Sequence, residues 1–391
     1  MKRLFALLLA TLLVLSLCAC GGETTEEPKT DTPVETKEYP LDKYNLGAYM
    51  IPYWSGDTVY QESVMLLEDA EGNLPQIPLL YEAKEILSVR SSSLQIEYQA
   101  GKDYQLVDGK LVIPEGSAIP TVSHDFYYPA EESDTAMELN ENYGEGFIYF
   151  KEGTAMHDRQ IAVTYTHEGT FDGAVPACKA EQLPKTAEKL KNGGELKVAF
   201  YGDSISAGRN STGREGGKPG APIWPLMFAS YVKENYPDTA VLYENPSVPG
   251  KKSAWGAENA EEFVGYGPDL CIIGFGMNDG SSKVDPEAFK ANIQTIMDAA
   301  RKGNPNCEFV LLSTMLPNPE ADNFLGKQEE YLPVLESMET EGVVVADMTT
   351  YHKSLLAHKR YYDMTGNNVN HPNDFLARAY AQLLWQTVVG Y

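Results

Sequence analysis

Cysteine, histidine and basic residues are scarce in this chain. Its 391 residues include 5 Cys and 6 His, and 31 Lys and Arg stand against 56 Asp and Glu, which gives a net charge of −25. So few cysteines exclude a disulfide scaffold, and no Cys/His cluster suggests a metal site. The acidic surface would repel phosphate backbones, so no nucleic-acid partner is expected and a neutral or cationic partner suits the chain better.

Long apolar runs are also missing, apart from one short run at the N-terminus. Met1-Lys2-Arg3 is basic, and residues 4–17 are apolar except for Thr11 and Ser16. A helix of this length spans about 21 Å, which is too short for a bilayer core of about 30 Å. The pattern predicts a secretory signal peptide.

The end of this run, Leu17-Cys18-Ala19-Cys20, resembles the lipobox of bacterial lipoproteins. The resemblance implies that residues 1–19 are a lipoprotein signal peptide. Cys20 would then carry the lipid and hold the protein at the cell membrane on its extracytoplasmic side; the alternative is a plain signal peptide whose cysteines are accidental. Residues 20–45 are rich in Thr, Glu, Pro and Lys, which predicts a disordered tether.

Residues 46–177 carry short alternating segments bounded by turn residues. Ser93–Tyr98 alternates polar and apolar side chains, and Arg159–Thr166 does the same. Two further runs flank Asp108-Gly109, which is a β-hairpin signature. We therefore expect a β-sandwich domain over residues 46–177.

A polar stretch at residues 178–195 follows, which we interpret as a linker. Apolar segments then alternate with amphipathic ones, which is typical of a parallel sheet covered by helices on both faces. Five such units predict an α/β, doubly wound, flavodoxin-like three-layer domain over residues 196–391. The expected strands are Leu196–Tyr201, Ala240–Glu244, Leu270–Phe275, Phe309–Thr314 and Val343–Ala346. The expected helices are Ile223–Asn235, Ala257–Val264, Pro286–Lys302, Gly326–Glu341 and Asp374–Val388.

Polar motifs follow three of these strands, where open parallel sheets bind their ligands. Ser204 lies in a Gly-Asp-Ser turn, Gly250 in a loop after the second strand, and Asn278 in Gly-Met-Asn-Asp after the third; His371 lies near the C-terminus. Taken singly, each fits a cap, turn or surface loop. In this order, the four blocks together resemble the SGNH (GDSL-type) hydrolases over about half of the chain.

The resemblance implies the roles of these residues. Ser204 would be the nucleophile and His371 the general base. The backbone N–H groups of Ser204 and Gly250 and the side chain of Asn278 would form the oxyanion hole. Two further residues are candidates to line the site. Trp255 follows Gly250 closely, and Asp203 is expected to cap neighbouring N–H groups with its carboxylate. This chemistry needs no metal and no organic cofactor.

One departure from the family pattern concerns the third catalytic member. Hydrolases of this type carry Asp three residues before the histidine, where this chain has Asn368. We expect Asn368 or a backbone carbonyl to orient His371, with Asp363 or Asp374 as further alternatives. If Asn368 faces the imidazole, Asn368→Asp should keep or raise activity.

An anchored esterase with an N-terminal β-sandwich resembles the two-domain carbohydrate esterases, in which a jelly-roll-like domain precedes the SGNH domain. The resemblance implies a serine esterase that removes small O-acyl groups, O-acetyl above all, from polysaccharide. Two alternatives are a lipase, lysophospholipase or thioesterase of the same fold, and a non-catalytic surface lipoprotein that binds glycans.

Overall fold

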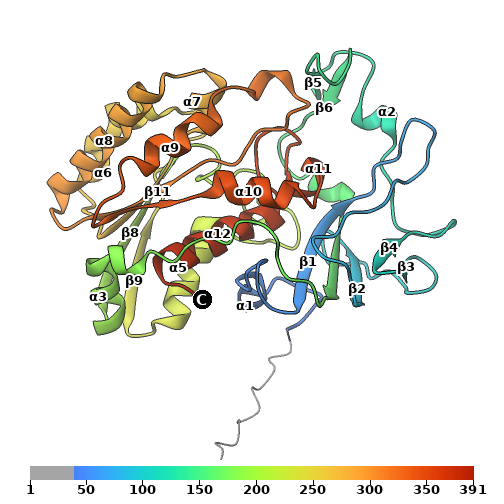
Figure 1. Ribbon diagram of the computed structural model, residues 1–391, viewed down its shortest axis with the longest axis horizontal. Helices are drawn as coiled ribbons and strands as arrows, with labels where there is room; N and C mark the ends of the chain where they lie inside the picture. The colour runs from blue at the N-terminus through green and yellow to red at the C-terminus, as the bar shows by residue number, and fades with distance from the viewer. Residues whose placement is uncertain (1–38) are drawn as a thin grey trace, which may run out of the picture. The chain divides into compact units, whose positions relative to one another are not determined.

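The computed structural model describes residues 39–391, apart from the side chains of residues 262 and 263 (Figure 1). The predicted signal peptide, Cys20 and most of the predicted tether lie outside the described residues. Within residues 39–391, no helix combines the length and the apolar character that a membrane crossing requires.

A five-stranded parallel sheet organises the second half of the chain. Its strand order is β12-β11-β10-β8-β9, so that the first strand in sequence, β8, lies inside the sheet, as in a flavodoxin-like fold. All five expected strands form within two residues of their predicted ends. They are β8 (Gly194–Gly202), β9 (Thr239–Glu244), β10 (Leu270–Gly274), β11 (Glu308–Leu312) and β12 (Val343–Ala346).

Helices cover both faces of this sheet, because alternate strand residues point to opposite sides. Cys271 and Ile273 of β10 pack in one apolar cluster with residues of α6 and α8, whereas Leu270 and Ile272 pack in another with residues of α5 and α12 (Figure 1). The three-layer α/β fold predicted from the sequence is therefore confirmed. The helices of this half are α3 (Pro184–Asn192), α4 (Thr212–Glu215), α5 (Trp224–Asn235), α6 (Ser253–Val264), α7 (Met277–Ser281), α8 (Pro286–Gly303), α9 (Tyr331–Glu336), α10 (Met348–Leu356), α11 (Tyr361–Met364) and α12 (Asp374–Val388).

One expected helix is much shorter than predicted. Instead of running over residues 326–341, α9 has six residues and follows a 3-10 turn, η4 (Gln328–Glu330). The backbone at Gly326 lies so close to α7 that an added Cβ would stand 1.8 Å from the carbonyl oxygen of Gly280. Because the backbone at Gly326 packs against α7, the helix begins only after this contact.

The region before α3 is antiparallel, as expected. It contains a three-stranded sheet of order β1-β7-β2 and two hairpins, β3-β4 and β5-β6, rather than long strands in two full layers. Its elements are α1 (Leu46–Tyr49), β1 (Thr58–Met65), β2 (Glu85–Ser91), β3 (Gln105–Val107), β4 (Lys110–Val112), α2 (His124–Tyr127), β5 (Ala136–Glu138), β6 (Phe147–Tyr149), η1 (His157–Arg159) and β7 (Gln160–Thr166).

Two local predictions in this region have different outcomes. The hairpin turn at Asp108-Gly109 is confirmed, and both residues have the positive φ angles, +48° and +74°, that a type I′ turn requires. The alternating segment Ser93–Tyr98 is not a strand. Leu94 has φ +61° and donates its N–H to the carbonyl of Ser91, so the chain turns there despite its alternating pattern.

The expected linker does not separate two independent cores. Helix α3 occupies half of residues 178–195, and residues 39–391 form one compact unit. The antiparallel region packs on α12, where Arg378 donates to the backbone carbonyls of Tyr60 and Gln61. A single apolar cluster includes Val163 of β7 and Leu383 of α12.

Candidate active site

A tight turn after β8 presents Ser204. Gly202 ends the strand beside Gly274 of β10, and an added Cβ at Gly202 would stand 2.2 Å from the carbonyl oxygen of Gly274. Only glycine allows the strands to come this close at the turn. Asp203 then accepts the N–H of Ile205 through Oδ1 at 2.9 Å, which closes the turn and fixes the position of Ser204.

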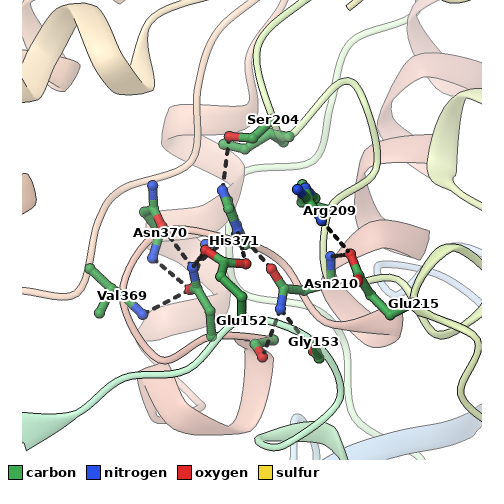
Figure 2. Close-up of polar contacts among 12 residues, drawn as sticks. Glu152, Gly153, Ser204, Arg209, Asn210, Glu215, Val369, Asn370 and His371 are labelled. Carbon is green, nitrogen blue, oxygen red and sulfur yellow. Dashed lines mark hydrogen bonds and ion pairs between the residues drawn. The ribbon is translucent and has the colours of Figure 1, made fainter. Parts of the chain in front are cut away.

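His371 reaches Ser204 from a loop between α11 and α12. Its Nε2 lies 2.8 Å from the Oγ of Ser204, although the two residues are 167 positions apart (Figure 2). The loop is folded back on itself, because Gly366 N–H and the Thr365 hydroxyl both donate to the carbonyl of His371, at 2.9 and 3.0 Å. Ser204 and His371 are 4% and 6% exposed, so the pair is largely shielded from water.

The loop after β9 brings Gly250 to the same turn. Val248 donates its N–H to the carbonyl of Gly202 at 3.1 Å, and the Asn278 amide donates to the carbonyl of Lys251 at 3.0 Å. These bonds tie both expected oxyanion-hole loops to the turn that holds Ser204. Within residues 39–391, the backbone N–H groups of Ser204 and Gly250 have no hydrogen-bond partner, so they remain available to a ligand oxygen.

The two residues expected to line the site, Asp203 and Trp255, differ in how far they are buried. Asp203 is 1% exposed, and burial raises its pKa to about 7. Its capping of Ile205 agrees with the prediction, but its burial keeps it from lining the site. Trp255 is half-buried, and the Nζ of Lys251, next to Gly250, lies 5.5 Å from the centre of its ring. Trp255 therefore remains a candidate for contact with a substrate.

Asn368 does not orient His371, contrary to our expectation. Its Oδ1 accepts the hydroxyl of Tyr127 at 3.0 Å, and its Nδ2 donates to the carbonyl of Tyr149 at 2.8 Å. The backbone at Asn368 is left-handed, with φ +74°, which directs the side chain toward the antiparallel region. Asn368 thus joins the histidine loop to α2 and β6.

The two alternative carboxylates are also occupied elsewhere. Asp363 accepts the N–H groups of Met65 and Arg360, at 2.8 and 3.1 Å. Asp374 accepts the N–H and the hydroxyl of Thr212, at 2.9 and 2.6 Å. Neither is among the hydrogen-bond partners of the imidazole.

Three other side chains surround Nδ1 of His371 instead. Asn210 Oδ1 lies at 2.7 Å and Glu152 Oε2 at 3.3 Å (Figure 2). Asn367 Nδ2 lies at 3.0 Å. Asn210 lies six residues after Ser204, and Asn367 directly precedes Asn368. Glu152 comes from the antiparallel region, 219 residues before His371, and no local sequence signal distinguishes it from the many other acidic residues.

Within residues 39–391, no group of three or more His, Cys, Asp or Glu side chains is arranged so that it could hold a metal ion. The site consists of a serine, a histidine, unpaired N–H donors and an amide. This arrangement can activate a hydroxyl and stabilise a developing oxyanion.

Comparison with known protein families finds one match, in the second half of the chain. Residues 200–379 match the GDSL-like lipase/acylhydrolase family. No curated protein matches the chain significantly.

Solved structures with a similar fold include three esterases. One is a two-domain esterase (CEX) active on acetylated mannans, co-crystallised with mannopentaose, at 21% identity and TM-score 0.43, over 54% of this chain and 53% of that one. The chain therefore matches only about half of the length of that esterase. A mutant of Axe2, an acetyl-xylooligosaccharide esterase from Geobacillus Stearmophilus, is 16% identical with TM-score 0.42, over 50% of this chain and 95% of that one. A carbohydrate esterase family 3 protein from Talaromyces cellulolyticus is 16% identical with TM-score 0.38, over 48% and 94%.

Proposed function

Residues 200–379 match the GDSL-like lipase/acylhydrolase family, and from this match we propose that the protein is a serine esterase that hydrolyses small O-acyl esters, O-acetyl above all, on polysaccharide. The observation that carries the proposal is the 2.8 Å contact between Ser204 Oγ and His371 Nε2. A serine hydroxyl is a weak nucleophile until a neighbouring base accepts its proton.

The proposed reaction assigns one role to each of these groups. Ser204 Oγ attacks the ester carbonyl while His371 Nε2 takes the hydroxyl proton. The tetrahedral oxyanion is stabilised by the N–H groups of Ser204 and Gly250 and by the Asn278 amide. His371 then gives its proton to the leaving alcohol, and water releases the acyl group from Ser204 by the same steps.

Two properties favour a small acyl group on a neutral polymer. Ser204 and His371 are only 4% and 6% exposed, so a substrate can reach only a small accessible part of each side chain. The net charge of −25 would repel anionic phospholipid surfaces and anionic thioesters. An uncharged acetylated glycan meets neither obstacle.

Turnover of p-nitrophenyl esters of increasing chain length tests this proposal. We expect acetate to be hydrolysed faster than butyrate and longer esters, and activity to disappear in Ser204→Ala. Ser206→Ala is the matched control, because Ser206 lies in the same turn but directs its hydroxyl to the carbonyl of Gly274. Acetate release from acetylated mannan or xylan then tests the polymer. A preference for long chains would favour a lipase or thioesterase, and no Ser204-dependent turnover would contradict an esterase.

We also propose that Cys20 carries a lipid anchor on the extracytoplasmic side of the membrane. The basic start, the short apolar run and the lipobox-like ending of residues 1–20 support this. Mass spectrometry of the membrane-bound protein should give an acylated N-terminal Cys20, and Cys20→Ser should move the protein to the soluble fraction. An unprocessed N-terminus would contradict the proposal.

A further inference from the structure

Two of the residues on the Nδ1 side of His371, Glu152 and Asn210, lie outside the four motif blocks. Glu152 lies between β6 and η1, and its carboxylate points at the imidazole beside the Asn210 amide (Figure 2). We propose that the third member of the catalytic group is divided between two residues, with Asn210 orienting the ring and Glu152 of the antiparallel region supplying the negative charge. This inference rests on the proposed esterase function.

The proton on the imidazole can be located from its partners. Nε2 must be unprotonated to accept the hydroxyl hydrogen of Ser204, so Nδ1 carries the hydrogen of the neutral ring. The Asn210 amide is held in one orientation, because its Nδ2 donates to the carbonyls of Gly153 at 2.8 Å and Gly366 at 3.2 Å. Its Oδ1 therefore faces Nδ1 at 2.7 Å and accepts that hydrogen.

The orientation of Asn367 is fixed by the same reasoning. Its Oδ1 accepts the backbone N–H groups of Val369, Asn370 and His371, each at 3.1 Å. Its Nδ2 lies 3.0 Å from Nδ1 of His371, but two donors cannot bond to each other. The two hydrogens go instead to Asn370 Oδ1 at 2.9 Å and to Glu152 Oε1 at 3.2 Å. Asn367 thus holds the carboxylate in place.

Glu152 supplies what Asn210 cannot. An amide oxygen accepts the Nδ1 hydrogen and so selects the tautomer, but it carries no full charge to balance the imidazolium that forms during acyl transfer. Glu152 Oε2 lies 3.3 Å from Nδ1. Burial alone would raise the pKa of this carboxyl, but the neighbouring His371 imidazole, the hydrogen bond from Asn367 and the nearby charge of Arg209 hold the pKa below its usual range. The carboxylate is therefore ionised at neutral pH.

The antiparallel region contributes two neighbouring residues to the site. Glu152 brings the charge, and the carbonyl of the next residue, Gly153, fixes the Asn210 amide. On the other side of Asn210, Glu215 accepts its backbone N–H at 3.3 Å and pairs with Arg209 at 3.4 Å. The site is complete only when the antiparallel region is packed against the α/β half of the protein, residues 194–391.

The loss expected on removing the charge is moderate. Where the wrong tautomer results from losing the triad acid, the rate falls by about 10⁴-fold. Here Asn210 would still select the tautomer in Glu152→Gln, and the Glu152 side chain is 47% exposed, so solvent weakens its effect. We therefore expect kcat to fall by about 10- to 100-fold with KM changed less than about 2-fold.

Three variants of the protein separate charge from packing. Glu152→Gln removes the charge and keeps the shape, Glu152→Asp restores a shorter carboxylate, and Glu141→Gln removes an exposed charge elsewhere in the same region. We expect the Gln variant to lose kcat with little change in thermal unfolding temperature, the Asp variant to recover part of it, and Glu141→Gln to match the parent. Unchanged kcat in Glu152→Gln would overturn the inference. Equal losses in Glu152→Gln and Glu152→Asp, with lowered unfolding temperatures, would also overturn it, because they would indicate a packing role.

A second measurement does not depend on turnover. The Nδ1 proton of His371 should give a low-field one-proton NMR resonance that is absent in His371→Ala and moves upfield in Glu152→Gln but not in Glu141→Gln. An unmoved resonance would overturn the inference even if no ester is found. Failure of the unmodified protein to hydrolyse any ester, with the resonance behaving as expected, would instead contradict only the proposed function.

Discussion

The ammonium nitrogen of Lys359 lies 2.6 Å from the carboxylate of Glu62, and neither side chain is exposed to solvent. Glu62, on β1, also accepts the N–H of Leu80 at 2.9 Å and the hydroxyl of Tyr165 at 2.7 Å. Lys359 lies just before α11. A fully buried and hydrogen-bonded ion pair therefore joins the antiparallel region to the α/β half of the protein, residues 194–391.

Removing one charge of this ion pair should lower the stability of the fold. Lys359→Met leaves the Glu62 carboxylate buried without a counter-ion, and we expect the free energy of unfolding to fall by about 3–5 kcal/mol. Replacing both residues, as Glu62→Gln with Lys359→Met, removes both charges and should recover much of that loss. Urea unfolding of the two single variants and the double variant measures this. Single variants that each cost under about 1 kcal/mol would show that the pair is not the tie we describe.

The sequence pattern predicts that position 368 affects activity, but the structure indicates that Asn210 affects activity and that Asn368 affects stability. Asn368→Asp places a carboxylate against the carbonyl of Tyr149. We expect it to lower the unfolding free energy by about 1–3 kcal/mol and not to raise activity. Asn210→Ala removes the acceptor 2.7 Å from Nδ1 of His371 and should lower kcat by about 100-fold or more. Initial rates and urea unfolding on both variants check this, and a faster Asn368→Asp enzyme would contradict the observed placement.

The parallel sheet could be predicted closely because β10, β11 and β12 are buried on both faces and therefore appear in the sequence as nearly continuous apolar runs. The positions of Ser204, Gly250 and Asn278 followed from the strand ends, since the carboxyl ends of parallel strands meet at one edge. Glu152 could not be found in this way. Its role depends on how two segments 219 residues apart pack together, and nothing near it in the sequence differs from an ordinary acidic loop.

The error at Asn368 has a different cause. The spacing to His371 matches the family pattern, but the left-handed backbone at Asn368 turns the amide toward Tyr127 and Tyr149. A sequence pattern gives the spacing of residues but not the φ angle that decides where a side chain points.

Asn278 should be needed more for the rate than for stability. Its amide is 3.5 Å from Asp203 Oδ2 and donates to the carbonyl of Lys251 at 3.0 Å, beside the unpaired N–H of Gly250. We expect Asn278→Ala to lower kcat by about 10²–10³-fold, as the loss of one oxyanion donor does elsewhere. Asn235→Ala, at the exposed end of α5, is the control. Equal kcat in the two variants would exclude the Asn278 amide from the oxyanion hole.

Asp203 should make the stability of the fold depend on pH. Burial raises its pKa to about 7, against 3.8 for an unperturbed aspartate, so the folded chain binds this proton more tightly than the unfolded chain. The contribution of Asp203 to the free energy of unfolding therefore decreases as pH rises from about 4 to about 7, by a total of about 4 kcal/mol, and changes little above that.

Asp203→Asn removes this titration while keeping an oxygen that can accept the N–H of Ile205. The variant should gain stability relative to the parent as pH rises, because only the parent must ionise a buried carboxyl. Urea unfolding at a series of pH values from about 4.5 to 8 measures the difference between the two proteins. A difference that stays constant, or that shrinks as pH rises, would mean that Asp203 titrates in its ordinary range and that the turn holding Ser204 accommodates a charged carboxylate without cost.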